Sequence, residues 1–247
     1  MSGRLYGVGT GPGDPELLTL KAVRAIAAAD TIAHFAKAGR TGNARPIVAA
    51  HIRPHHRELA LHYPVTTEID AGSEDYRTAI GAFYEEAAAR VANELEAGRS
   101  VAVLSEGDPL FYGSYMHLHV RLAHRFDTEV IPGVTAMSGC WSAAGLPLMQ
   151  GDDVTTVLPG TLPEAELSRR LRDTDAAIVM KVGRNLPKIR AALAATGRLE
   201  GAVYVERGTM AEARIVPLAG AGDLVAPYFS IVLVPGWHAR PRAEAAE

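Results

Sequence analysis

The sequence predicts an α/β protein with two α/β domains and open, largely parallel or mixed sheets. Short apolar segments typical of strands alternate with amphipathic helical segments, and this order produces parallel strands joined by crossover helices. The alternation starts again after Gly145-Leu146-Pro147, which indicates a second domain. The chain of 247 residues is 48% hydrophobic, which is enough to fill the core of one large domain or of two compact ones.

The first half of the chain begins with a buried strand over 5–8 that ends in a glycine-rich turn. Asp14 is expected to cap a helix that starts at Pro15 and runs to about residue 29. Residues 39–72 are rich in Gly, Pro, His and Arg, and we expect mostly loop there, with one short helix. The other elements expected in this half are a strand over 31–36, a helix over 74–96 ended by Gly98, a strand over 101–104, a helix around 113–124 and a strand over 129–131.

The second half repeats the alternation. The link between the expected strands 202–206 and 213–216 is too short for a crossover helix, so the second sheet should be mixed. The expected domains are residues 1–145 and 146–237, and the tail 238–247 is expected to be disordered. The remaining elements expected here are strands over 153–158, 176–182 and 229–234 and helices near 163–173 and 186–196.

Composition excludes several functional classes. The net charge of −3 and the pI near 6.3 argue against a protein that binds nucleic acid or membrane surfaces. Cys140 is the only cysteine, which excludes an internal disulfide and any metal site built from several cysteines. The chain runs from its first residues into a strand without a targeting segment, and no apolar run is long enough to span a membrane. We therefore expect a cytoplasmic protein.

A glycine-rich loop, Gly7-Val8-Gly9-Thr10-Gly11-Pro12-Gly13-Asp14-Pro15, follows the first strand. Such a loop lets a ligand approach bare backbone and the N–H groups at a helix start, although a plain tight turn has the same composition. A dinucleotide-binding loop would have glycine at Pro12, and Ala36-Lys37 occupies the place of its acidic ribose ligand. A phosphate-binding P-loop is excluded because the chain contains no Gly-Lys pair.

Two more turns of small residues follow the next two buried strands of the first half. They are Glu106-Gly107-Asp108-Pro109 and Pro132-Gly133-Val134-Thr135-Ala136. Ligands of open α/β sheets bind at the carboxyl ends of the strands. The three turns should therefore lie along one edge of the sheet and outline a cleft for a ligand of nucleoside size.

The nine histidines suggest a metal site, but their spacing does not support one. Neither His51, His55 and His56 nor His117 and His119 form a His-Glu-x-x-His pattern, and no cysteine accompanies them, so no metal is expected. Nucleophilic hydrolysis has no support either, because a Gly-x-Ser-x-Gly elbow is missing.

In their order and setting, the three turns resemble those of the tetrapyrrole methylases, the class III methyltransferases that use S-adenosylmethionine. Met180-Lys181-Val182-Gly183-Arg184-Asn185 and Val205-Glu206-Arg207-Gly208-Thr209 extend the resemblance to about residues 4–235. Within the family, segments 108–114, 180–188 and 227–230 are similar to those of enzymes that methylate carbon 20 of precorrin-2. His34-Phe35 departs from the Tyr-Pro expected near the end of the second strand.

The resemblance implies two α/β domains with a deep cleft between them, in a homodimer. It implies that S-adenosylmethionine binds in a folded shape between the two domains. It also implies that many donor contacts are made through backbone atoms. The donor contacts carried over are Pro12, Glu106, Gly107, Asp108, Phe111, Thr135, Ala136, Val182 and Gly208, with Tyr112, Thr209 and Ser230 as further candidates.

The implied reaction is methylation of precorrin-2 at carbon 20 to give precorrin-3A in cobalamin biosynthesis. The meso proton must leave, so a general base is expected among Tyr112, Tyr115, His117, His119 and Glu106. Precorrin-2 carries carboxylates that Arg and Lys can bind. The candidate cations are Lys37, Arg40, Arg53, Arg57, Arg184 and Lys188.

Several alternatives stay open at this point. The substrate could be the cobalt-loaded form of the same tetrapyrrole, or the reaction could take place at another ring position. An RNA base as target is disfavoured by the low positive charge. A carrier of tetrapyrroles without enzymatic activity is the alternative from another functional class, and tight binding of S-adenosylmethionine would argue against it.

Overall fold

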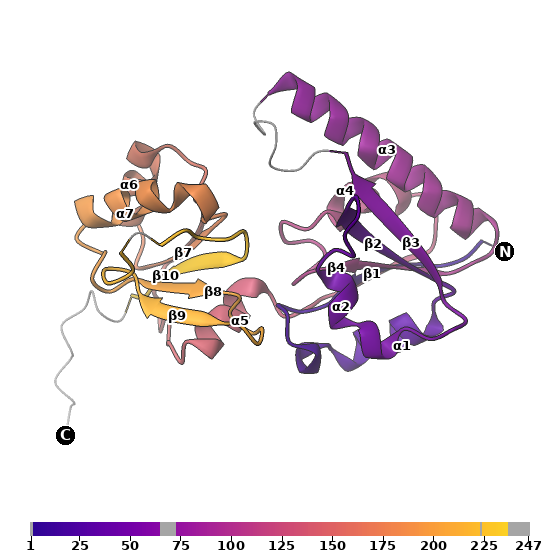
Figure 1. Ribbon diagram of the computed structural model, residues 1–247, viewed down its shortest axis with the longest axis horizontal. Coiled ribbons are helices and arrows are strands. Elements are labelled where there is room, and N and C mark those ends of the chain that lie inside the picture. The colour runs from indigo at the N-terminus through magenta and orange to yellow at the C-terminus, as the bar shows by residue number, and fades with distance from the viewer. Residues whose placement is uncertain (1, 65–72, 223, 237–247) are drawn as a thin grey trace. The chain divides into compact units, whose positions relative to one another are not determined.

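The computed structural model describes residues 2–64, 73–222 and 224–236. The chain divides into two compact units, Met1–Ala136 and Met137–Glu247, each built on a five-stranded sheet (Figure 1). The division falls at Ala136 rather than at residue 145, because the helix α5 (Ala136–Ala143) packs within the second unit. There, a Cβ added to Gly208 would lie 2.6 Å from Cys140 Sγ on α5. The tail 238–247 lies outside the described residues.

The sheet of the first unit is parallel throughout, with the strand order β3-β2-β4-β1-β5. Parallel strands have their carboxyl ends on the same edge. The segments that follow β1, β4 and β5 therefore leave the sheet side by side, because these three strands are neighbours. The strands are β1 Leu5–Gly9, β2 Thr31–Lys37, β3 Arg57–Tyr63, β4 Val101–Ser105 and β5 Thr128–Ile131.

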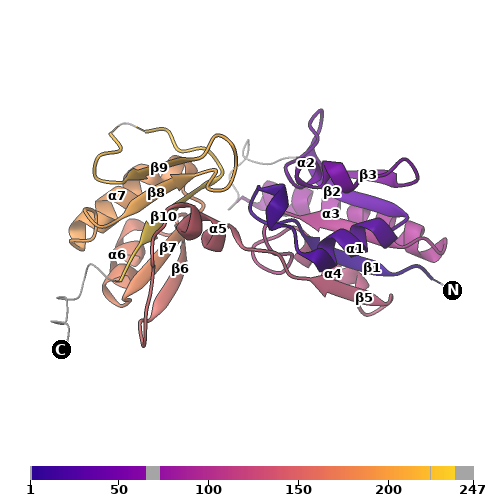
Figure 2. The same cartoon turned by 90° about the horizontal axis from the view of Figure 1, so that it is seen from below.

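Helices cover both faces of this sheet, and apolar side chains pack on each face (Figures 1 and 2). Phe83, Val91 and Leu118 of α3 and α4 are buried on one face. Ile26 of α1 and Val48, which follows α2, are buried on the other. The helices are α1 Leu20–Ala28, α2 Ala44–Ile47, α3 Glu74–Glu96 and α4 Tyr115–Leu122, with short 3-10 helices at Pro15–Leu17 and Ala49–His51.

The first helix starts later than the sequence predicts. Asp14 caps a short 3-10 turn, in which its carboxylate accepts a hydrogen bond from Glu16 N at 2.9 Å. Leu18 and Thr19 are extended, with ψ of 133° and 147°, so the turn cannot continue as a helix. The Thr19 hydroxyl caps α1 instead, accepting from Ala22 N at 3.0 Å. The prediction of one continuous helix from Pro15 was wrong.

The strand β3 replaces part of the loop predicted over 39–72. It pairs with β2 from Arg57 to Tyr63 and lies at the edge of the sheet. Only Leu61 of its seven residues is buried, so the segment lacks the continuous apolar run that marks the central strands.

The second unit has the mixed sheet that the sequence predicts, with the strand order β6-β7-β10-β8-β9. The strand β10 runs antiparallel to both of its neighbours, and β9 runs antiparallel to β8. These strands are β6 Thr155–Pro159, β7 Ala176–Met180, β8 Val203–Glu206, β9 Arg214–Pro217 and β10 Ser230–Val234.

Two helices, α6 Glu164–Arg172 and α7 Leu186–Ala195, lie together on one face of this sheet (Figure 1). Their apolar side chains, including Leu167 and Ile189, form one buried cluster with strand residues such as Tyr204. A 3-10 turn over Gly183–Asn185 joins the end of β7 to α7. None of the helices in the described ranges combines the length and the apolar character needed to span a bilayer.

Candidate functional site

The three small-residue turns of the first unit meet at one edge of its sheet, as the sequence predicts. Gly107 N donates to Gly11 O at 2.8 Å, and Gly11 N donates to Gly107 O at 3.3 Å. The third turn joins them because Gly133 N donates to Asp108 Oδ2 at 3.2 Å. A Cβ on Gly9 would lie only 2.7 Å from Gly107 O, so this close approach requires glycine.

Gly107 occupies the centre of this arrangement. Its φ of 64° is a left-handed conformation that glycine adopts without strain. A Cβ added to Gly107 would lie 3.5 Å from Ala136 N and 3.8 Å from Thr135 Cα. The predicted donor contacts Gly107, Thr135 and Ala136 therefore lie together at the start of α5.

Hydroxyl groups from three elements anchor the end of the 106–114 loop. Ser114 Oγ is hydrogen-bonded to the Tyr63 hydroxyl at the end of β3 and accepts from the Tyr84 hydroxyl of α3 at 3.1 Å. The Tyr63 ring packs against Phe35 and Phe83, with ring centroids 5.7 and 4.9 Å away. Burial raises the pKa of Tyr63, so its hydroxyl stays protonated and keeps its hydrogen.

Glu106 is a candidate base whose surroundings raise its pKa. The residue is exposed overall, but the protein atoms around its carboxyl group displace water and raise its pKa above the usual 4.5. Hydrogen bonds from the backbone of Asn43 and Ala44 and from the Asn43 side chain act in the opposite direction.

The other candidate bases lie in different settings. Tyr112 is 49% exposed on the 106–114 loop. Tyr115 is completely buried with its ring packed against Gly7, and its hydroxyl lies 3.3 Å from His119 Nδ1. His117 is exposed and stacks on Tyr84, with ring centroids 3.9 Å apart. The packing of Tyr115 favours a structural role for it.

The structure separates the predicted substrate cations of the first unit. Lys37 is the last residue of β2, and Arg40 N donates to Lys37 O at 2.9 Å, so both lie at the edge that carries the three turns. Arg57 is the first residue of β3 and pairs with Thr31, which places it at the opposite edge. Arg53 precedes it on the same side. These two arginines were predicted from a segment read as loop, and the unpredicted strand separates them from the turns.

The motif residues of the second unit also gather at one edge of its sheet. Val182 follows β7, Gly208 follows β8, and Ser230 begins β10, which lies between these two strands. Ser230 Oγ donates to Pro227 O at 2.7 Å. The remaining predicted residues of this unit lie close to these positions in sequence, with Thr209 after Gly208, Arg184 in the 3-10 turn and Lys188 in the first turn of α7.

Three residues other than glycine adopt positive φ among the described residues, and each belongs to a motif loop. They are Tyr112 at 55°, Lys181 at 56° and Arg207 at 48°. Such a conformation costs on the order of 1–2 kcal/mol for residues with a Cβ and is concentrated at functional sites. Sequence reasoning missed Lys181 and Arg207 as site residues, and their backbone conformation is the signal that identifies them.

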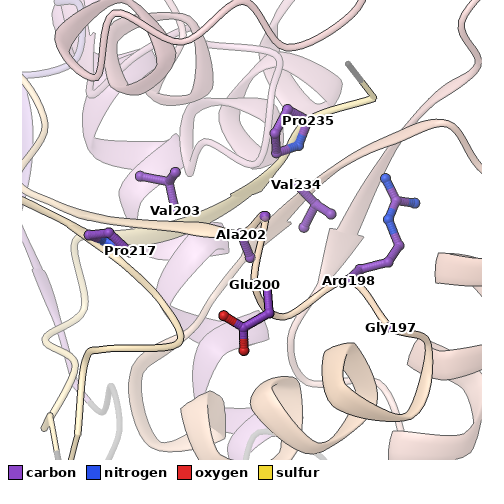
Figure 3. Close-up of a pocket in the computed structure, with 9 residues that line it drawn as sticks. Gly197, Arg198, Glu200, Ala202, Val203, Pro217, Val234 and Pro235 are labelled. Carbon is purple, nitrogen blue, oxygen red and sulfur yellow. The ribbon is translucent and has the colours of Figure 1, made fainter. Parts of the chain in front are cut away.

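A cavity of about 480 Å³ lies at the other edge of the second sheet (Figure 3). Ala202 and Val203 at the start of β8, Val234 at the end of β10 and Pro217 at the end of β9 line it. The motif residues are at the opposite ends of these strands. Across the described ranges, no group of three or more His, Cys, Asp or Glu side chains could hold a metal ion.

Comparison with known proteins agrees with these features. The family described as Tetrapyrrole (Corrin/Porphyrin) Methylases matches residues 4–221. A precorrin-2 C(20)-methyltransferase from Sinorhizobium sp is 69% identical over 239 residues, which cover 97% of this chain and 98% of the relative. A cobalt-precorrin-2 C(20)-methyltransferase from Salmonella typhimurium is 31% identical, and the match covers 95% of this chain and 97% of that protein.

Solved structures show the same fold. A cobalt precorrin-4 methyltransferase aligns with a TM-score of 0.72 at 23% identity, covering 96% of both chains. A uroporphyrin-III C-methyl transferase from Thermus thermophilus, solved with S-adenosyl homocysteine, aligns with a TM-score of 0.67 at 23% identity, covering 96% of this chain and all of that one. The chain therefore belongs to the tetrapyrrole (corrin/porphyrin) methylases and is a methyltransferase.

Proposed function

We propose that this enzyme transfers a methyl group from S-adenosylmethionine to carbon 20 of precorrin-2, giving precorrin-3A. The observation that carries the proposal is the 69% identity, over nearly the full length of both chains, to a protein named precorrin-2 C(20)-methyltransferase.

The donor residues that we propose come from both units. In the first unit they are on the three joined turns, where Gly9, Gly107 and Gly133 allow the backbone segments to approach one another closely. Backbone N–H and C=O groups suit the polar groups of a nucleoside, so the turns fit S-adenosylmethionine. The proposed contacts are Pro12, Glu106, Gly107, Asp108, Phe111, Tyr112, Thr135 and Ala136 from the first unit and Val182, Gly208, Thr209 and Ser230 from the second.

The protein's contribution to catalysis is mainly orientation and proton removal. The donor supplies a methyl group that is already electrophilic, and the meso carbon of a reduced tetrapyrrole is a nucleophile. Alignment of two such reactants can contribute on the order of 7–11 kcal/mol. We propose Glu106 as the base that accepts the meso proton, because its raised pKa makes the carboxylate more basic than an ordinary glutamate.

The carboxylates of the substrate require cations, and four of the six predicted residues keep a suitable place. Lys37 and Arg40 lie at the motif edge of the first unit, and Arg184 and Lys188 follow β7 in the second. We propose that these four contribute to binding of the substrate, since a guanidinium can pair with a carboxylate through two hydrogen bonds.

Incubation of the purified enzyme with precorrin-2 and S-adenosylmethionine under anaerobic conditions tests the reaction. The expected products are S-adenosylhomocysteine and a tetrapyrrole heavier by one methyl group in place of a hydrogen. A parallel reaction with the cobalt-loaded tetrapyrrole addresses the second candidate, which the 31% identical relative from Salmonella typhimurium favours. We expect the metal-free substrate to react faster, and the reverse order would support the cobalt-dependent reaction.

We further propose that the enzyme is a homodimer, as the family resemblance implies. Sedimentation at micromolar concentration should then give twice the chain mass of 26.2 kDa. A single species of one chain mass throughout a dilution series would contradict the dimer.

A further inference from the structure

We propose that Lys181 and Arg207 bind two carboxylate groups of the tetrapyrrole substrate. The inference deepens the proposed function and rests on it for the class of ligand. Neither residue was among the cations that the sequence predicted. Their positive φ angles and their positions on either side of β10 identify them.

The first observation is the choice of residue at left-handed positions. Eleven glycines have positive φ in the described part of the chain, and only Tyr112, Lys181 and Arg207 adopt it with a side chain. Glycine would adopt these conformations without strain. A long cationic side chain at two such positions therefore indicates that the side chain itself has a function.

The second observation is that one strand separates the two cations. The register pairs Ser230 of β10 with Glu206 of β8 and Val232 of β10 with Val179 of β7. Continued by two residues, the second pairing places Lys181 opposite Ser230. Two strand spacings then separate Lys181 from Glu206, which amounts to about 10 Å.

Arg207 directly follows Glu206 and remains attached to β10, because Arg207 N donates to Phe229 O at 3.0 Å. The two cations therefore stand on either side of the start of β10. They lie at the same edge as the proposed donor contacts Val182 and Gly208, which they directly precede in sequence.

The third observation is the exposure of both side chains. Lys181 is exposed, and the Arg207 side chain is 40% exposed. The Arg207 guanidinium lies 3.4 Å from Glu206 Oε1, which is longer than a strong charge-assisted hydrogen bond. Glu206 also accepts a hydrogen bond from the Tyr204 hydroxyl at 3.1 Å. A guanidinium has five N–H donors, so Arg207 can still pair with a carboxylate of a ligand.

The spacing suits a rigid ligand that carries several carboxylates around its rim. A tetrapyrrole with acetate and propionate side chains on neighbouring rings has this character. Two cationic side chains that start from backbone positions about 10 Å apart would each hold one such group and set the rotation of the ring in its plane. The pair would then help to decide which meso carbon faces the donor.

The binding of uroporphyrin, a fluorescent tetrapyrrole octacarboxylate, tests this inference without methyl transfer. The variants are Lys181→Asn and Arg207→Asn, because asparagine removes the charge and tolerates left-handed φ. We expect each variant to bind uroporphyrin at least tenfold more weakly, with a melting temperature equal to or above that of the wild type. The affinity for S-adenosylhomocysteine should change less than twofold.

Two further variants serve as controls. Lys181→Arg keeps the charge and should retain most of the affinity. Arg172→Asn removes an exposed cation from the last turn of α6. This helix leads to the start of β7, whereas Lys181 follows the end of that strand. The variant should therefore leave uroporphyrin binding unchanged.

Unchanged affinity for uroporphyrin in both asparagine variants would overturn the inference, as would a wild-type enzyme that does not bind uroporphyrin. Methylation at another carbon, combined with the expected loss of uroporphyrin binding, would refute the proposed reaction and support the carboxylate site.

Discussion

Glycine at a few positions makes the proposed donor site possible. Gly107 is bonded to Gly11 through both of its backbone groups, while a side chain on it would point toward Thr135 and Ala136. We propose that the bound nucleoside lies beside Thr135 and Ala136, where a side chain on Gly107 would interfere with it. The chemistry of the site thus depends on the absence of side chains as much as on their presence.

Replacement of Gly107 by valine should abolish binding of S-adenosylmethionine. The variant adds backbone strain, because φ is 64°. Its methyl groups would also fill the space beside Ala136 N, which lies 3.5 Å from the new Cβ and where we propose that the donor binds. Calorimetric titration measures the donor affinity, and circular dichroism should show the fold retained.

A matched control is Gly197→Val. Gly197 has a similar φ of 69°, and nothing lies within 4 Å of its added Cβ. It carries the same strain, on the order of 1–2 kcal/mol, away from the motif loops. Donor affinity should survive in this control, and an equal loss in both variants would attribute the effect to strain.

Glu106→Gln tests the base and the sign of its pKa shift. Folding favours the protonated carboxyl because its pKa is raised, so stability contributed by this group is lost as pH rises through the folded pKa. The glutamine variant should therefore melt at a higher temperature than the wild type at pH 8. The difference should shrink as pH falls toward 4.5, the usual pKa of glutamate.

The same substitution should lower kcat by about 10²–10³-fold, the range expected for loss of a general base. In the wild type, the acid limb of the pH profile of kcat should lie above pH 4.5 and be missing in the variant. Glu96→Gln, at an exposed ion pair with Arg125, is the control and should change neither property. A glutamine enzyme with wild-type kcat would remove Glu106 from the chemistry.

At the scale of elements, the 106–114 loop depends on a strand and a helix that are distant in sequence. Tyr63 of β3 and Tyr84 of α3 both hydrogen-bond to Ser114, at the end of the loop that carries Tyr112. The anchor explains how the loop can hold Tyr112 at a φ of 55°, because the structure on both sides of the residue is fixed.

Ser114→Ala should loosen this loop. Two partly buried tyrosine hydroxyls would lose their partner, so we expect a destabilisation of about 1–3 kcal/mol and a fall in kcat of about tenfold. Donor affinity should change little, because the joined turns remain. Chemical denaturation and steady-state kinetics measure the two effects.

Ser100→Ala is the matched control. Ser100 precedes β4 at the opposite edge of the sheet, where its hydroxyl accepts from Arg4 N at 3.2 Å. This control should lose stability without losing kcat. A normal kcat in the Ser114 variant would contradict the anchoring role.

The elements that the sequence predicted correctly are those with a strong local signal. The central strands are continuous apolar runs, and α3 has both an amphipathic pattern and a serine cap, in which Ser73 accepts from Tyr76 N at 3.1 Å. The strand β3 was missed because an edge strand with one buried residue looks like a loop. Helix α5 was missed because it begins within a turn already assigned to ligand binding, with Cys140 and Gly139 as its only buried residues.

For the candidate site, too, the sequence predicts only the features that have a strong local signal. The positions of the glycine turns could be predicted because each turn follows a predicted strand, although small residues at a strand end are equally typical of a plain tight turn. The strain at Lys181 and Arg207 is not visible, because a positive φ depends on how the ends of β7 and β8 are held. The placement of Arg53 and Arg57 away from the turns follows from the direction of β3, which local sequence does not reveal.

At the scale of the whole molecule, each unit collects its motif residues at one edge of its own sheet. In the first unit the parallel strand order produces this arrangement, and in the second the antiparallel insertion of β10 between β7 and β8 adds Ser230 to the same edge. In both sheets the motif residues therefore lie at the ends of strands, as expected of enzymes whose ligands bind in open α/β sheets.

The position of the transferred methyl group tests the central claim most directly. The enzyme is incubated anaerobically with precorrin-2 and S-adenosylmethionine labelled with carbon-13 in the methyl group, and the product is examined by carbon NMR. We expect one labelled methyl group, bonded to the meso carbon between rings A and D. Label on a pyrrole carbon would keep the methyltransferase and contradict methylation at carbon 20. No transfer to either the metal-free or the cobalt-loaded tetrapyrrole, from an enzyme that binds the donor tightly, would contradict the substrate class.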